Sequence, residues 1–198
     1  MTSKGIFIKR LFDLFLAIMA LLILWWVILI AWLASLAVHN SNGFFIQERV
    51  GLNGKLFKII KLRTMVFKKE VNTTITTASD VRITLFGQFL RKYKIDELPQ
   101  IFNVIKGEMS FVGPRPDVPG YADVLQGKDR LILAVRPGIT GPAQLVYKNE
   151  ELLLENQRNP IQYNDEVIWP DKVRINKEYV ENYTFSKDIY YILKTIVS

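Results

Sequence analysis

Residues 94–100, KIDELPQ, place two carboxylates side by side, Asp96 and Glu97, within a strongly basic chain. A structural interpretation is a helix start, because Asp is a good N-cap and a proline such as Pro99 is tolerated in a first helical turn. A catalytic interpretation is that one carboxylate attacks phosphorus as a covalent nucleophile. Mg²⁺ held between the pair and a diphosphate would ease the repulsion of the two charges. Residue chemistry leaves both interpretations open.

Several basic side chains are candidates for binding phosphate: Lys61, Arg63, Arg91, Arg115 and Arg136. Arg115 lies between two prolines in VGPRP, and Arg136 precedes Pro-Gly in VRPGITG. Because proline restricts the backbone, each of these two guanidinium groups is a fixed fork that can grip a diphosphate through two parallel hydrogen bonds. A structural clamp within the loop is an equally good interpretation of each.

The composition narrows the chemistry that such a site can use. The chain has 198 residues, a formal net charge of +7, one histidine and no cysteine. The length suits one domain with a short appendage, and the charge suits an anionic partner: nucleic acid, an anionic membrane face or a phosphorylated substrate. Disulfides, thiolate metal sites and His/Cys zinc sites are excluded. A catalytic metal must then have oxygen ligands, which favours Mg²⁺ or Mn²⁺.

The segment from Leu14 to Val38 is apolar almost throughout and carries no charged side chain. A bilayer crossing needs about 20 such residues. The segment is too long for a signal-peptide core, lacks a following cleavage pattern, and runs longer without a charge than a buried core helix usually does. We therefore expect a basic lead and membrane-inserted helix over residues 1–38, and a second domain over residues 39–198.

The rest of the pattern predicts an α/β fold that is mostly helical, with one short β-hairpin and amphipathic helices at the membrane interface. The hairpin covers residues 44–65 and turns at Asn53-Gly54, which is a strong turn signal. Helices are expected over 80–94, from 96 or 97 to 106 with Gly107 as the stop, over 148–157, and over 186–197 with Ser186 as the N-cap.

Three other segments have no regular pattern. Residues 72–79 are polar, and we expect them to be mobile. The Pro-Gly stretches 110–120 and 136–144 are expected to be loops, neither regular helix nor central strand.

Long motifs in a fixed order resemble those of the bacterial sugar transferase family, the monotopic phosphoglycosyl transferases: QERVGLNGKLFKIIKLRTM, DVRITLFGQFLRKYKIDELPQIFNVIKGEMSFVGPRP and RPGITGPAQ. The resemblance runs from KRLFD at residues 9–13 to DIYYILKT near the end of the chain. The length resembles that of the small family members, which consist of the catalytic core alone.

The resemblance implies a reaction and a place. Such enzymes transfer a sugar-1-phosphate from a UDP-sugar to undecaprenyl phosphate, and release UMP and the undecaprenyl-diphosphate sugar. This is the first membrane step of glycan assembly, at the cytoplasmic face of the bacterial inner membrane. The implied partners are the UDP-sugar, undecaprenyl phosphate, membrane lipid and downstream glycosyltransferases, with no nucleic acid.

The resemblance also implies roles for the candidate residues. The family's Asp-Glu dyad falls on Asp96 and Glu97. Asp96 would attack the β-phosphorus and form an aspartyl phosphosugar intermediate, while Glu97 would help to hold Mg²⁺ or handle a proton, so that both acids are the expected metal ligands. Arg115, in the family's GPRP loop, would hold the diphosphate or nucleotide. The other implied phosphate-facing bases are Lys61, Arg63, Arg91 and Arg136.

The membrane segment departs from the family pattern. The family commonly breaks this helix at a Ser-Pro pair, whereas the middle of the segment here reads LILWWVILI and the first proline of the chain is Pro99. A cytosolic substrate and the positive-inside rule nevertheless put both flanks of the segment on one side. We therefore expect a re-entrant helix that bends near residues 22–28. We also expect Pro142, in GPAQ, to reshape a loop where many members have a bulky residue.

Two other function classes are carried as alternatives. One is a non-catalytic membrane scaffold for a glycan pathway, which turnover would exclude. The other is a membrane-tethered nucleic-acid binder, although no RNP-like or helix-turn-helix pattern accompanies the basic charge. The sequence names neither the sugar nor the glycan.

Overall fold

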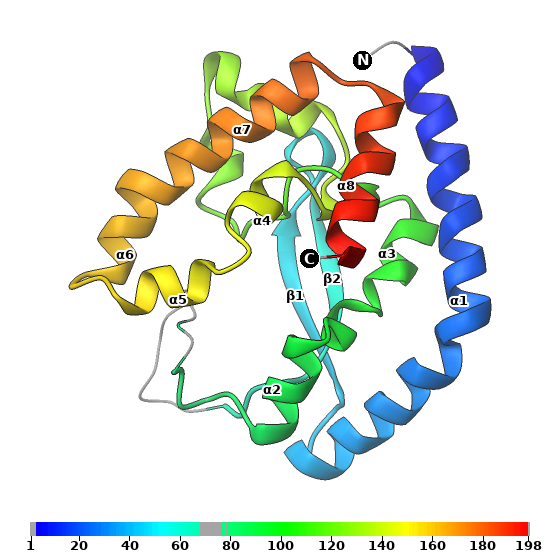
Figure 1. Cartoon of the computed structure of the whole chain (residues 1–198), viewed down its shortest axis with the longest axis vertical. Helices are drawn as coiled ribbons and strands as arrows, with labels where there is room; N and C mark the ends of the chain where they lie inside the picture. The colour runs from blue at the N-terminus through cyan, green and yellow to red at the C-terminus, as the bar shows by residue number, and fades with distance from the viewer. Residues whose placement is uncertain (1–2, 68–76, 78, 198) are drawn as a thin grey trace.

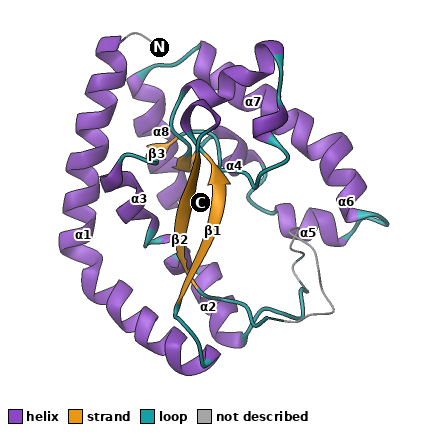
Figure 2. Ribbon diagram, turned by 180° about the vertical axis from the view of Figure 1, so that it is seen from behind, coloured by secondary structure: helices purple, strands orange, loops and turns teal. Residues whose placement is uncertain are grey.

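The computed structural model describes residues 3–67, 77 and 79–197. Helices dominate, and the central hairpin lies between α1 on one side and α5, α6 and α7 on the other (Figure 1 and, from behind, Figure 2). The helices are α1 Ser3–His39, α2 Leu85–Lys92, α3 Gln100–Lys106, α4 Pro142–Val146, α5 Glu150–Glu155, α6 Pro160–Tyr163, α7 Trp169–Glu181 and α8 Phe185–Val197. The strands are β1 Phe44–Val50, β2 Leu56–Leu62, β3 Ser110–Val112 and β4 Gly138–Thr140. The predicted fold class is confirmed.

The hairpin forms as its sequence predicts. Strands β1 and β2 pair antiparallel from Phe44 opposite Leu62 to Val50 opposite Leu56. Between them Asn53 and Gly54 have φ of 56° and 79°, the left-handed region that asparagine and glycine adopt most readily. The inner face of β2 packs on α3 and α1 in a small apolar core.

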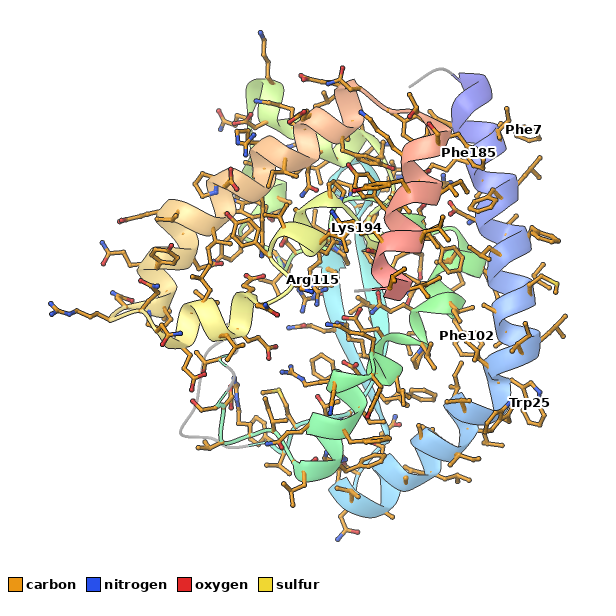
Figure 3. All side chains as sticks on the ribbon, viewed as in Figure 1. Phe7, Trp25, Phe102, Arg115, Phe185 and Lys194 are labelled. Carbon is orange, nitrogen blue, oxygen red and sulfur yellow. The ribbon has the colours of Figure 1, made fainter. Side chains whose placement is uncertain are left out.

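Helix α1 is long and apolar enough to cross a bilayer, with a mean hydropathy of 3.0 in a window of which 17% is buried. Its exposed apolar side chains agree with membrane association, since water is a poor solvent for so large an apolar surface. Figure 1 shows that α1 changes direction along its length, and Figure 3 labels Trp25 near that change. No proline or glycine lies there. How α1 lies relative to a membrane stays a prediction.

The basic lead of α1 binds the domain that follows it. Lys9 Nζ lies 2.6 Å from Asp188 Oδ2 of α8, and both side chains are buried. The hydroxyls of Tyr179 and Tyr183 donate to the same carboxylate. Arg10 donates to the carbonyl oxygens of Val104 and Ile105 at the C-terminal end of α3. The membrane helix is thus joined to the rest of the chain by buried charge as well as by apolar packing.

The helix predicted over residues 80–94 begins only at Leu85. The Thr84 side chain accepts a hydrogen bond from Gly87 N at 2.9 Å and so caps α2, which explains the later start. The helix predicted from residue 96 or 97 also begins later, at Gln100, after a separate 3₁₀ turn over Ile95–Glu97. The predicted stop is confirmed, since Gly107 ends α3 with φ of 86°.

The expectation that 110–120 and 136–144 contain no regular structure is wrong in part. Strands β3 and β4 pair in parallel within them, because Gly113 and Gly138 pack backbone to backbone with no room for a Cβ atom. Pro142 occupies the first turn of α4, where its missing N–H needs no partner.

The two remaining predicted helices form with small changes of boundary. Over 148–157 the structure has α5, in which Glu150 pairs with Lys172 and Glu151 pairs with Arg91. The C-terminal helix α8 begins at Phe185, one residue before the expected cap. The stretch 72–79, predicted to be mobile, lies almost wholly outside the described residues.

Candidate active site

The adjacent acids lie on the 3₁₀ turn that joins α2 to α3. The N-cap of this turn is Lys94 and that of α3 is Pro99, so Asp96 caps neither, and the capping interpretation is wrong. Asp96 is 8% exposed, and its buried Oδ1 has no hydrogen-bond partner within the described part of the chain. A buried carboxylate oxygen without a partner is costly, so its presence points to a role that requires a free oxygen.

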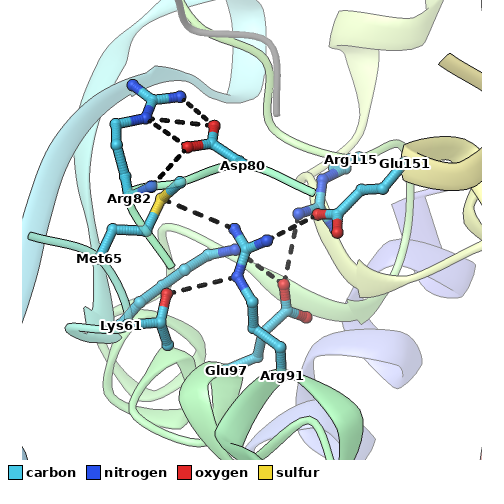
Figure 4. Close-up of polar contacts among 9 residues, drawn as sticks. Lys61, Met65, Asp80, Arg82, Arg91, Glu97, Arg115 and Glu151 are labelled. Carbon is cyan, nitrogen blue, oxygen red and sulfur yellow. Dashed lines mark hydrogen bonds and ion pairs between the residues drawn. The ribbon is translucent and has the colours of Figure 1, made fainter. Parts of the chain in front are cut away.

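Glu97 is held by two cations from other parts of the chain (Figure 4). Lys61 Nζ, on β2, lies 2.7 Å from Glu97 Oε1, and Arg115 Nη2 lies 3.3 Å from the same oxygen. Burial acts against the charge of Glu97, but the charges of Lys61 and Arg115 outweigh it and hold the pKa of this carboxyl well below its usual range. Glu97 is therefore a fixed anion at any physiological pH.

The two neighbouring carboxyls titrate far apart. Burial, and then the negative charge of Glu97, raise the pKa of Asp96 to about 6, against the opposing charges of Lys61, Arg91 and Lys94. At neutral pH Asp96 is thus mostly ionised but poorly solvated. Such a carboxylate is a better nucleophile than a solvated one, since its pKa is nearer to the working pH.

The structure brings three of the five predicted bases to the acids. Lys61 and Arg115 contact Glu97, and Arg91 lies close enough to act on the charge of Asp96. Arg91 is itself held between Glu151, at 2.9 Å, and the hydroxyl of Thr64, at 3.3 Å (Figure 4).

The other two predicted bases bind backbone carbonyls instead. Arg63 Nε donates to Asn42 O at 2.9 Å, near the end of α1. Arg136 Nε donates to Gly107 O at 2.8 Å, at the C-terminal end of α3. Arg136 thus has the geometry of the loop clamp that the sequence left open.

Sequence reasoning missed Arg49, at the end of β1. Its Nη1 donates to Pro116 O at 3.2 Å and its Nη2 donates to Gln47 Oε1 at 2.6 Å, while Val50 N donates to Asp117 O at 2.9 Å. Strand β1 therefore donates hydrogen bonds to two successive backbone carbonyl groups of the loop that carries Arg115. Arg49 belongs to the QER run, which the sequence places in the expected hairpin and in a family motif but which gives no sign of this contact.

A small polar cavity lies beside the contact between Arg49 and Pro116. Its lining includes Arg49, Lys61, Gln100 and Arg115, so three cationic side chains converge on it. Burial, and then the charge of Arg115, lower the pKa of Arg49 to about 10, which leaves it cationic at neutral pH. Positive charge concentrated beside one fixed carboxylate suits a ligand with more than one negative charge.

The acids also fit the expected cation. No group of three or more His, Cys, Asp or Glu side chains comes together among the described residues. At this turn the described part of the chain offers the two adjacent carboxylates, Asp96 and Glu97. Carboxylate oxygens are the ligands that Mg²⁺ prefers, and Mg²⁺ commonly completes its shell with water and substrate phosphate. The unpartnered Oδ1 of Asp96 is a suitable ligand atom.

The fold and site define a protein with a long apolar helix that suits a membrane, and with a buried carboxylate near a small cavity lined by three cationic side chains. Comparison with known proteins gives the same class. Residues 4–198 match the family model described as "Bacterial sugar transferase". The chain is 36% identical to the "Uncharacterized sugar transferase EpsL" of Bacillus subtilis over 96% of this chain and 85% of that protein.

Two longer relatives match through part of their length. The chain is 33% identical to the "Undecaprenyl-phosphate galactose phosphotransferase" of Salmonella typhimurium over 96% of this chain and 40% of that protein. It is 39% identical to the "UDP-glucose:undecaprenyl-phosphate glucose-1-phosphate transferase" of Xanthomonas campestris over 81% of this chain and 34% of that protein. The chain belongs to the bacterial sugar transferase family and is a phosphoglycosyl transferase.

Proposed function

We propose that this protein transfers a sugar-1-phosphate from a UDP-sugar to undecaprenyl phosphate through an intermediate on Asp96. The observation that carries the proposal is the buried, unpartnered Oδ1 of Asp96 beside a Glu97 that two cations hold in place. The names of the Salmonella and Xanthomonas relatives support the lipid acceptor, and the second supports a UDP-linked donor.

In the first step a carboxylate oxygen of Asp96 attacks the β-phosphorus of the donor. A bond forms between that oxygen and the phosphorus, the bond from the β-phosphorus to the bridging oxygen breaks, and UMP leaves with the electron pair. Arg115 and Lys61 face the developing charge on the phosphate oxygens, where fixed cations stabilise a transition state without reorganisation. Glu97 keeps both cations in position.

In the second step a phosphate oxygen of undecaprenyl phosphate attacks the same phosphorus. The new bond joins the two phosphates, and the bond from Asp96 to phosphorus breaks, so that the carboxylate is regenerated. Each half-reaction forms one bond to phosphorus and breaks one, with no net redox change.

Mg²⁺ belongs to the proposal as the cofactor, with Asp96 and Glu97 as its protein ligands. When bound, it would neutralise charge on the donor diphosphate and lower the repulsion that an anionic nucleophile meets there. The two acids supply the negative charge that holds the cation: Glu97 is a permanent anion, and Asp96 is ionised above a pH of about 6.

The proposed location is the cytoplasmic face of the bacterial inner membrane. UDP-sugars are cytosolic, and α1 supplies an apolar surface that suits the bilayer. Downstream glycosyltransferases would then receive the lipid-linked sugar at the same face.

A panel of UDP-sugars with undecaprenyl phosphate and Mg²⁺ tests the proposed function. UMP should be released with at least one donor, and Asp96→Asn should abolish the release. Asp129→Asn is the matched control, because Asp129 pairs with Lys177 on the surface. This variant should retain full turnover. Failure of every donor would favour the non-catalytic scaffold.

A further inference from the structure

Lys94 has an unusual backbone for its residue type. Its φ and ψ are 56° and 21°, in the left-handed region, and it directly precedes the turn that carries Asp96. The other described non-glycine residues with positive φ are Asn40 and Asn53, the residue type that tolerates this region best. Hydrogen bonds from Lys94 N to Arg91 O and from Glu97 N to Lys94 O fix the conformation. Glycine would adopt it more easily, so the lysine side chain is the feature that needs a reason.

The other cations near the two acids form ion pairs, whereas the described structure shows none for Lys94. Lys61 and Arg115 bind Glu97, and Arg91 binds Glu151. Lys94 is exposed, and within the described ranges its ammonium makes no ion pair or hydrogen bond. It is nevertheless close enough to act on both Asp96 and Glu97. An exposed, unpaired cation beside a nucleophile can receive an incoming anion without first breaking another contact.

The helix before Lys94 presents an apolar face. Leu85 and Phe89 of α2 and its C-cap residue Tyr93 follow one another at intervals of four residues, and they are 85%, 52% and 58% exposed. The rings of Phe89 and Tyr93 lie 5.0 Å apart. Lys94 stands at the end of this surface, between it and Asp96 in the chain. An apolar surface that ends in a cation matches a ligand whose hydrocarbon chain ends in a phosphate.

We infer that Lys94 binds the phosphate of the polyprenyl acceptor for the second half-reaction, while the exposed face of α2 contacts the acceptor's hydrocarbon chain. The inference rests on the proposed function and adds a residue to it. Lys94 acts through its charge alone and transfers no proton, so the atoms balance as in the second step above. It neutralises the repulsion between the acceptor phosphate and the fixed anion Glu97. Its charge also favours the ionised form of Asp96, so UMP release is compared at pH 8, where that carboxyl is ionised in wild type and variant alike.

The two half-reactions separate this role from the others. Lys94→Asn removes the charge but tolerates the left-handed backbone, so folding should be unaffected. We expect it to raise the KM for undecaprenyl phosphate about tenfold, while the UMP burst with donor alone at pH 8 keeps its wild-type amplitude. Lys128→Gln removes an exposed charge outside α2 as the control, and it should change the acceptor KM less than about twofold.

A short-chain polyprenyl phosphate supplies a second comparison. Lys94→Asn should weaken short and long acceptors equally, whereas Phe89→Ala should weaken the long acceptor more. An unchanged acceptor KM for Lys94→Asn, or an equal rise for Lys128→Gln, would overturn the inference. A wild-type enzyme that releases no UMP from any donor would instead overturn the proposed function.

Discussion

Arg49 reaches from the end of β1 to the carbonyl oxygen of Pro116, 3.2 Å from its Nη1, and so fixes the residue that directly follows Arg115. The two arginines are far apart in sequence, yet they line the same polar cavity. Arg115 in turn contacts Glu97 at 3.3 Å. The position of the loop that carries Arg115 therefore depends on a side chain from the hairpin.

Replacing Arg49 should weaken binding of the UDP-sugar, because Arg49 holds the loop that carries Arg115. We expect Arg49→Gln to raise the KM for the UDP-sugar at least about fivefold, because the Pro116 carbonyl loses its donor and the cavity loses a charge. The KM for the lipid acceptor should change little. Steady-state kinetics of the double variant with Arg115→Lys provide the control: effects that simply multiply would show that the two arginines act independently.

Arg115 itself should be poorly replaced by lysine. A guanidinium fork offers parallel hydrogen bonds that an ammonium lacks, so we expect Arg115→Lys to lower kcat/KM at least about tenfold, roughly 1.4 kcal/mol of transition-state stabilisation. Arg136→Lys is a matched comparison from the other Pro-Gly loop, and its effect should appear in thermal stability rather than in KM, because Arg136 binds Gly107 O. Unchanged kinetics for Arg115→Lys would make Arg115 a structural clamp.

Asp96 should destabilise the folded protein when it is ionised. Its pKa is raised to about 6 from an ordinary value of 3.8, so the folded state binds the proton more tightly than the unfolded state between these two pH values. Stability due to this group is therefore present below about pH 4 and is lost as pH rises through about 6. We expect Asp96→Asn to raise the free energy of unfolding at pH 7.5 by on the order of 1–3 kcal/mol.

The same titration sets the activity of the first half-reaction. The nucleophile must be ionised, so donor-dependent UMP release should fall as pH drops below about 6.

Denaturant unfolding of wild type and Asp96→Asn at pH 7.5 and pH 4 measures the effect of the Asp96 charge on stability. An equal difference between the two proteins at both pH values would contradict the assignment of the raised pKa to Asp96.

The membrane arrangement can be tested with single thiols, since the chain has no cysteine. In intact cells a membrane-impermeant maleimide should label neither Ser3→Cys nor Lys55→Cys, and after permeabilisation it should label both. This follows if α1 re-enters and both flanks are cytosolic. Labelling of Ser3→Cys alone in intact cells would mean that α1 spans the bilayer.

Local signals predicted the parts of the fold that depend on local chemistry. Asn53-Gly54 favours a turn and Gly107 favours a helix stop, because asparagine and glycine adopt positive φ more readily than other residues. The short strands β3 and β4 were missed because their pairing depends on the close approach of Gly113 and Gly138, which are distant in sequence.

The site shows the same division. The family motifs indicated Asp96 and Glu97 as the acids. They did not show that the Oδ1 of Asp96 is buried with no hydrogen-bond partner among the described residues, because its surroundings come from packing. Lys61 and Arg115 approach Glu97 from β2 and from the loop after β3. Arg49 was overlooked because its partner, Pro116, is 67 residues away. Sequence alone gives no sign of such a contact.

The central claim is that Asp96 forms a covalent intermediate, and intact-protein mass spectrometry tests it most directly. Wild-type enzyme is incubated with Mg²⁺ and an accepted UDP-sugar, without lipid acceptor, and is then quenched. We expect a mass increase equal to one phosphosugar, stoichiometric release of UMP, loss of the adduct when undecaprenyl phosphate is added, and no adduct on Asp96→Asn. UMP release that strictly requires the lipid acceptor, with no adduct at any time, would contradict the covalent mechanism and favour direct transfer between the two substrates.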